Sequence, residues 1–144
     1  MFRMIVGMSR YQKAIQNDLI SASKPIDIHI AKLLLFPGVQ TTHHWQHEIY
    51  TALNDIDYQK GSNKWPKASF IEKSLAMRND MLSIYVQHAK RDEKDLEPRY
   101  VSLDVVTQIV KKYQNWIAQV LSEYGYVEED IVYHKLDELI KSTL

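Results

Sequence analysis

The sequence predicts an all-α fold, a single-domain bundle of five to six helices over residues 1–144. Apolar residues recur at intervals of three and four along nearly the whole chain, which is the helical period. No stretch alternates strictly between apolar and polar residues over more than a few positions, and a strand would be tolerated only in "MFRMIV" at the N-terminus. The four glycines and four prolines lie where turns or helix ends are expected. A chain of 144 residues with 45% hydrophobic and 25% charged residues has the size and composition of one ordinary domain.

The first third of the chain predicts two helices. The first runs from the N-terminus to about residue 22, and its apolar face consists of Met4, Met8, Tyr11, Ile15, Leu19 and Ala22. Pro25 suits the first turn of a second helix, where its missing N–H would have no partner anyway. This second segment, "PIDIHIAKLLLF", is apolar on almost every side, so we expect it at the centre of the bundle. Pro37 and Gly38 end it.

Two further helices are predicted in the middle of the chain. Thr41 or Thr42 is an N-cap candidate for a helix over 42–58. After the loop "QKGSNKWPK", Ser69 and Glu72 have the spacing of a capping box, and a helix is predicted to continue to about Lys90.

The fifth helix is the most regular of the chain. Ser102 is its predicted N-cap, and Gly125 follows it in the position that favours a left-handed residue. Its apolar residues fall on one side, and the other side carries Lys111, Lys112, Gln114, Asn115, Gln119 and Ser122. The acidic residues at 128–130 favour the start of a sixth helix, and the short intervening turn predicts an antiparallel pair. We expect the second, fourth and fifth helices at the centre.

The composition excludes several classes of protein. Without cysteine, the chain has no disulfide framework, zinc ribbon or cysteine nucleophile, which fits a cytoplasmic location. Lys plus Arg equals Asp plus Glu at 18 each, so there is no electrostatic reason to bind bulk nucleic acid. The longest apolar run beyond the N-terminus, "IAKLLLF", is too short to span a membrane. We interpret "MFRMIVGM" as the first part of the fold and not as a signal peptide.

The stretch "TTHHWQHEIY" at 41–50 raises the main functional question, because it holds three histidines and a glutamate. The apolar positions Trp45, Ile49, Ala52, Leu53 and Ile56 define the inward side of its helix. His43 and His47 lie nearly opposite that side. The cluster is therefore expected to be a capped helix start, with Trp45 and Ile49 in the core and His43 and His47 in solvent.

The alternative is a helical metalloprotein or a metal-dependent enzyme. His44 and Glu48 share the flank of the same helix, and with His29 or His88 they would supply the ligand types that a divalent metal takes inside a helical bundle. "HHWQHE" and "HAKRD" resemble the spaced histidine and carboxylate pairs of hemerythrin-like bundles, whose other ligand pairs are missing here. Apart from this metal, no cofactor is expected.

Candidate interface residues lie on the fourth helix and in the loop before it. Phe70, Met77, Met81 and Ile84 form a second apolar stripe, and methionine is common in adaptable contacts. Arg78 lies within the apolar arc, and Trp65 either pins its loop to the core or lines a binding surface.

There is no glycine-rich phosphate loop, serine elbow or H-E-x-x-H motif. We therefore expect a small cytoplasmic helical protein that is not an enzyme and not bound to a membrane. It would act through contacts with a protein partner or with itself as a homodimer.

Overall fold

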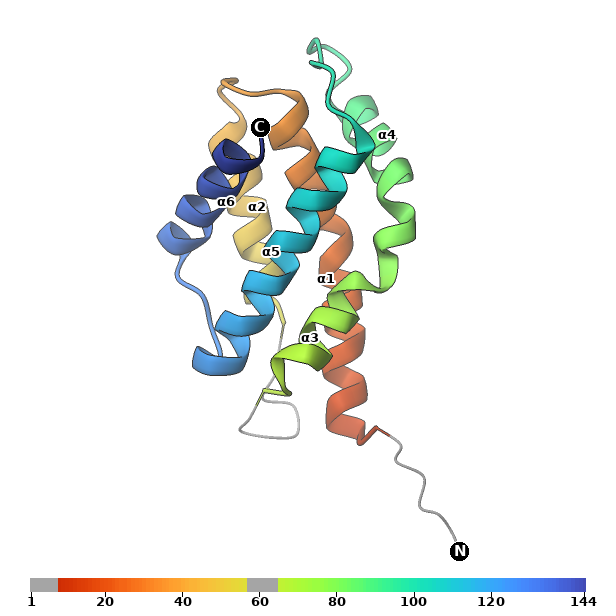
Figure 1. Ribbon diagram of the computed structural model, residues 1–144, viewed down its shortest axis with the longest axis vertical. Coiled ribbons are helices and arrows are strands. Elements are labelled where there is room, and N and C mark those ends of the chain that lie inside the picture. Colours follow the sequence, from red (N-terminus) through yellow and green to blue (C-terminus); the bar gives the residue numbers. More distant parts are fainter. Residues whose placement is uncertain (1–7, 57–64) are drawn as a thin grey trace, which may run out of the picture.

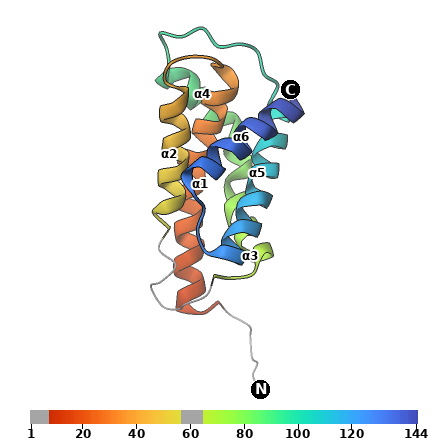
Figure 2. The same ribbon diagram turned by 90° about the vertical axis from the view of Figure 1, so that its left-hand side faces the viewer.

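The described residues, 8–56 and 65–144 of a computed structural model, form an all-α bundle without strands, as the sequence predicted. Residues 1–6, where alone a strand was tolerated, lie outside this range, as does the segment 57–64. The chain runs alternately up and down the long axis (Figure 1), through α1 (Arg10–Leu35), α2 (Thr42–Asn54), the series α3 (Ala68–Leu75), η2 (Ala76–Met81) and α4 (Leu82–Asp92), then α5 (Leu103–Tyr124) and α6 (Glu129–Thr143). In the side view α6 lies over α2 and α5 (Figure 2), and it packs against both.

The first two predicted helices are one continuous helix, α1, with Pro25 in its interior. The prediction of a break was wrong because packing outweighs the cost of the proline, about 3 kcal/mol in an isolated helix. Every residue from 26 to 36 except His29 is buried, so this half of α1 is at the centre, as expected. Ser9 begins α1 with a capping box, since its hydroxyl accepts from the Gln12 N–H and the Gln12 side chain accepts from the Ser9 N–H.

The predicted helix over 69–90 is interrupted by the 3₁₀ segment η2, where Arg78 leaves helical geometry at φ −108° and ψ 18°. The expected capping box is also wrong, because α3 begins after Lys67 and no side chain caps it. The buried side-chain amide of Gln114 donates to the carbonyl of Leu75 at 3.2 Å and to Asn79 Oδ1 at 2.8 Å. Gln114 was expected on the polar side of its helix. Its amide instead bonds the last residue of α3 and a residue of η2, so it ties α5 to the point where the preceding helix is interrupted.

The ends of the other helices depend on local hydrogen bonds. Ser102 caps α5 by accepting from the Val105 N–H, and Gly125 ends it at φ 77°, both as predicted. Thr41, one of the two predicted candidates, is the N-cap residue of α2, but its side chain makes no capping hydrogen bond, and Thr42 Oγ1 donates to the Val39 carbonyl. Arg99, in the connector between α4 and α5, donates through its backbone N–H to Leu35 O at 2.9 Å and through Nε to Leu34 O at 2.7 Å. The connector thereby satisfies carbonyls at the end of α1.

The core lies between the second half of α1 and the inner faces of the helices around it. Helix α5 is central, as expected, and α2 contributes Trp45 and Ile49. Helix α4 was also expected at the centre, but it buries one face only and lies at the edge of the bundle (Figure 1). Within the described parts of the chain, no helix combines the length and the apolar character needed to cross a membrane.

Candidate functional site

The histidines of α2 lie beside α6, a helix that the sequence had not placed near them. His43 and His47 are exposed, and Trp45 and Ile49 are buried, so the faces of α2 were predicted correctly. The Nδ1–H of His47 donates to Glu129 Oε2 at 2.7 Å. The Tyr133 hydroxyl donates to the same oxygen, and the edge of the His43 ring meets the Tyr133 ring at 5.1 Å between centroids. These side chains therefore link α2 to the start of α6.

The electrostatics of this cluster favour an ionised Glu129. The hydrogen bonds from Tyr133 and then from His47 lower the pKa of Glu129 below its usual value. Burial of the phenol, followed by its bond to Glu129, raises the pKa of Tyr133. One carboxylate oxygen that accepts from two donors on different helices is a charge-assisted link between those helices.

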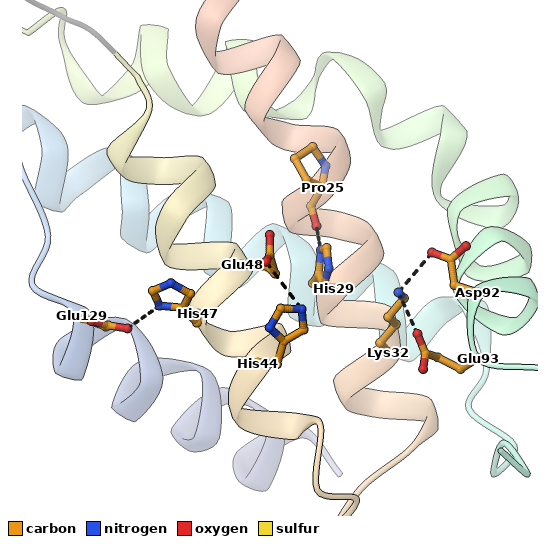
Figure 3. Close-up of polar contacts among 9 residues, drawn as sticks. All are labelled: Pro25, His29, Lys32, His44, His47, Glu48, Asp92, Glu93 and Glu129. Carbon is orange, nitrogen blue, oxygen red and sulfur yellow. Dashed lines mark hydrogen bonds and ion pairs between the residues drawn. The ribbon is translucent and has the colours of Figure 1, made fainter. Parts of the chain in front are cut away.

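The four candidate metal ligands come from three helices and, among the described residues, do not share a partner outside their own helix. Figure 3 shows three of them, His29, His44 and Glu48. His44 Nε2 lies 3.5 Å from Glu48 Oε1, and His88 Nε2 lies 3.4 Å from Asp92 Oδ1. His29 Nδ1–H donates to the Pro25 carbonyl at 2.6 Å. Burial lowers the pKa of His29, which outweighs the opposing effect of that hydrogen bond. Among residues 8–56 and 65–144, no three His, Cys, Asp or Glu side chains converge into a group that could hold a metal ion.

Beside His29, a buried lysine joins α1 to the end of α4 (Figure 3). Lys32 Nζ lies 3.0 Å from Asp92 and 3.0 Å from Glu93, and only 8% of its side chain is exposed. Partial burial of Asp92 acts to raise its pKa, but the hydrogen bond and charge of Lys32 dominate and lower it. Sequence reasoning missed this group. A lysine inside an otherwise apolar helix was a signal that a carboxylate must come to it, since buried charges are costly without a partner.

The interface candidates of the fourth predicted helix differ in exposure, and η2 interrupts the helix between them. Met77 and Ile84 are each 54% exposed, whereas Phe70, Arg78 and Met81 are half-buried. Trp65 donates from Nε1 to the Gly125 carbonyl at 3.0 Å and packs against the core, so it holds its loop to the end of α5.

Two neighbouring grooves that share Trp116 lie where α5 and α6 meet, and together we call them the Trp116 surface. Its apolar half is a groove of about 310 Å³ lined by Trp116, Val120, Tyr124, Tyr126, Val127 and Ile131, with Glu128 at its edge. Its basic half is a groove of about 480 Å³ whose lining includes Lys111, Lys112, Asn115, Trp116, Gln119 and Lys135. Trp116 lines both halves. Tyr124, Tyr126 and Ile131 are 67%, 62% and 48% exposed, so large apolar side chains here face solvent.

One buried carboxyl lies apart from these groups. Asp27 in α1 is 1% exposed, and its Oδ2 has no hydrogen-bond partner among the described residues. Burial raises the pKa of Asp27 to about 8, so the side chain is a neutral acid at pH 7. It does not line any of the grooves described above.

Comparisons with known proteins give no match: no family model, curated protein or solved structure is similar to this chain.

Proposed function

We propose that this protein acts by contact with protein chains through the Trp116 surface, and not by catalysis. The observation that carries the proposal is the exposure of Tyr124, Tyr126 and Ile131 around a half-buried tryptophan. Aromatic side chains are enriched at protein interfaces, where tryptophan and tyrosine contribute much of the binding energy. Large exposed apolar patches are rare on monomeric proteins, and those with a polar rim mark contact sites for other proteins.

The lysines beside this patch support the same role. Lys111, Lys112 and Lys135 line the basic half, and one carboxylate, Glu138, pairs with Lys135 at 2.9 Å. Charges at the rim of an interface steer the encounter and fix its orientation more than they add affinity. A protein ligand with apolar and acidic side chains therefore fits this surface.

Site-specific photo-crosslinking in living cells tests this function. A photoreactive phenylalanine derivative replaces exposed Gln119 within the Trp116 surface, and in a control chain it replaces exposed Lys24 on α1. We expect a discrete crosslinked protein from position 119 and not from position 24. We also expect the adduct to disappear when Lys112→Glu is added, because the change reverses the charge beside the crosslinker without touching the core.

Two results would contradict the proposal. One is equal crosslinking from both positions, which would indicate non-specific encounters. The other is an adduct from position 119 that persists unchanged with Lys112→Glu and with Tyr124→Ser, since the surface would then not select the partner. Far-ultraviolet circular dichroism of each variant verifies that the helices remain folded.

A further inference from the structure

The exposed side chains of α5 that border the Trp116 surface have a defined polarity. Lys112, Trp116, Gln119 and Glu123 recur at intervals of four, three and four residues, so they form one stripe along the helix. Lys112, Gln119 and Glu123 are exposed, and Trp116 is half-buried between them. With a rise of about 1.5 Å per residue, Glu123 lies about 16 Å beyond Lys112. The stripe is therefore basic at one end, aromatic and polar in the middle and acidic at the other end.

Helix α6 runs antiparallel to α5 (Figure 1). The charged residues at its side of the surface have the same order, with positive charge at one end and negative charge at the other. Lys135 lines the basic half together with Lys112, and Glu128 lies at the edge of the apolar half, near the end of α5. Among the described residues, Lys112 donates to Thr143 Oγ1 on α6 at 3.3 Å, and Lys135 pairs with Glu138 on its own helix at 2.9 Å. Exposed contacts of this kind contribute little and are easily exchanged. The whole surface thus carries positive charge at one end and negative charge at the other.

We infer that the Trp116 surface binds a second copy of this chain, with the two α5 helices antiparallel around a two-fold axis that passes between Trp116 and Gln119. This inference rests on the proposed function and names its partner. In a two-fold interface the same patch meets itself, so the patch must be complementary to its own rotated image. Rotation about this axis places Lys112 of each chain opposite Glu123 of the other.

The same rotation brings the apolar parts together. Trp116 of each copy meets Gln119 and Val120 of the other, next to the axis. The exposed rings of Tyr124 and Tyr126 lie at the edge of the contact, where their hydroxyls keep access to water. Burial of the tryptophans provides the affinity, and the paired charges exclude the parallel orientation, in which lysines would face lysines.

Complementary charge reversal tests the inference on the purified, untagged full chain. Sedimentation equilibrium from micromolar to submillimolar concentration measures the dimer fraction of the wild type, of Lys112→Glu, of Glu123→Lys and of an equimolar mixture of the two variants. Each single variant places like charges opposite one another twice, so its dissociation constant should rise at least about tenfold. In the mixture, both pairs are again of opposite charge, and a dimer of one chain of each kind should form with an affinity close to that of the wild type.

Matched changes on other surfaces serve as controls. Lys24→Glu on α1 and Asp95→Lys in the connector reverse exposed charges of the same kinds, and neither alone nor mixed should they alter the dimer fraction. A wild type that is monomeric at every concentration overturns the inference, as does a dimer that is indifferent to both single reversals or a mixture that fails to associate. If the chain is monomeric but position 119 still gives a lysine-dependent adduct with another protein, the proposed function stands without self-association. If both fail, the function falls too.

Discussion

Asp27 is a carboxyl in an environment that is unusual for its type. It is buried, its Oδ2 has no partner among the described residues, and burial raises its pKa to about 8, so it remains protonated in the folded chain well above the ordinary pKa of 3.8 that applies in the unfolded chain. Because the folded state binds the extra proton across that interval, stability is greatest at the acidic end and falls as pH rises towards 8. The loss approaches about 1.4 kcal/mol per pH unit.

We predict that Asp27→Asn removes this dependence, because the amide has nearly the same shape and does not titrate. Urea denaturation of the variant and the wild type at pH 5 and pH 8 should show a larger advantage of the variant at the higher pH. Asp95→Asn, a change of an exposed carboxylate, serves as control and should leave the pH dependence as it is. An equal slope for Asp27→Asn and the wild type would show that the carboxylate is already ionised in the folded protein.

The two faces of α2 should differ sharply in their contribution to stability. Trp45 is 2% exposed and packs near Phe36, at 6.1 Å between ring centroids, so Trp45→Ala should cost about 3–5 kcal/mol. His43→Ala with His47→Ala removes exposed contacts with α6, which should cost about 1 kcal/mol or less. Thermal and urea denaturation measure both. The opposite ranking would mean that α6 is held mainly by the histidines.

Angles around α2 were sufficient to predict its buried apolar side chains, but not the burial of Gln46, which donates to Asp137 on α6, nor what lies next to the exposed residues. The apolar positions fix the inward direction of one helix. They contain no information about which neighbour flanks it, and the approach of α6 to His47 depends on packing between distant segments. The same reason hid the role of Gln114, whose partners are Leu75 at the end of α3 and Asn79 within η2.

At the scale of the elements, the ion pairs of Lys32 with Asp92 and Glu93 join α1 to the end of α4. Without these carboxylates, burial of the lysine charge would be costly. Asp92→Asn with Glu93→Gln leaves Lys32 enclosed without a counter-charge, and we expect a loss of roughly 2–3 kcal/mol. The value lies below that of a fully buried pair because both carboxylates are partly in solvent. Lys32→Met should cost about 1 kcal/mol or less, since it replaces a buried charge by an apolar side chain of similar length. Urea denaturation compares the two, and equal losses would indicate that Lys32 is not desolvated.

Helix boundaries were predictable where a local signal is decisive and not where packing overrides it. Ser102 and Gly125 act within one turn of the backbone, and both ends of α5 were predicted from them. Pro25 and Ser69 carry local signals as well, but burial on both sides of the proline keeps α1 continuous, and α3 begins before Ser69. Local preferences of about 1–3 kcal/mol are small compared with the burial of several large side chains.

For the whole molecule, the fold class followed from the helical period of the apolar residues, because each helix must turn one side to the core. The Trp116 surface did not follow. By sequence, Trp116, Val120 and Tyr124 belong to the apolar side of their helix. In the structure, α6 covers only part of that side, and Tyr124 remains 67% exposed. Exposed apolar surface is a property of the assembled helices, and the period of one helix cannot reveal it.

Self-association through this surface also predicts how the whole molecule melts. A ligand that binds only the folded state stabilises it, and here the ligand is another folded chain. Raising the concentration from the dissociation constant to about a hundredfold above it therefore adds on the order of 2 kcal/mol. For a domain of this size that corresponds to a rise of roughly 5 °C in Tm.

The informative variant for this effect carries Lys112→Glu and Glu123→Lys in the same chain. Its surface has the reverse polarity and is again complementary to its own rotated image. Differential scanning calorimetry over a hundredfold range of concentration should therefore give it the concentration-dependent Tm of the wild type, whereas either single reversal should show a smaller rise of Tm over the same range. Net charge is the same in the double variant and the wild type, whereas each single reversal changes it by two units. Lys24→Glu changes net charge as Lys112→Glu does, so it is the control for an effect of net charge alone. A double variant that melts like the single ones would mean that Lys112 and Glu123 act on the folded monomer, and not opposite one another across a two-fold axis.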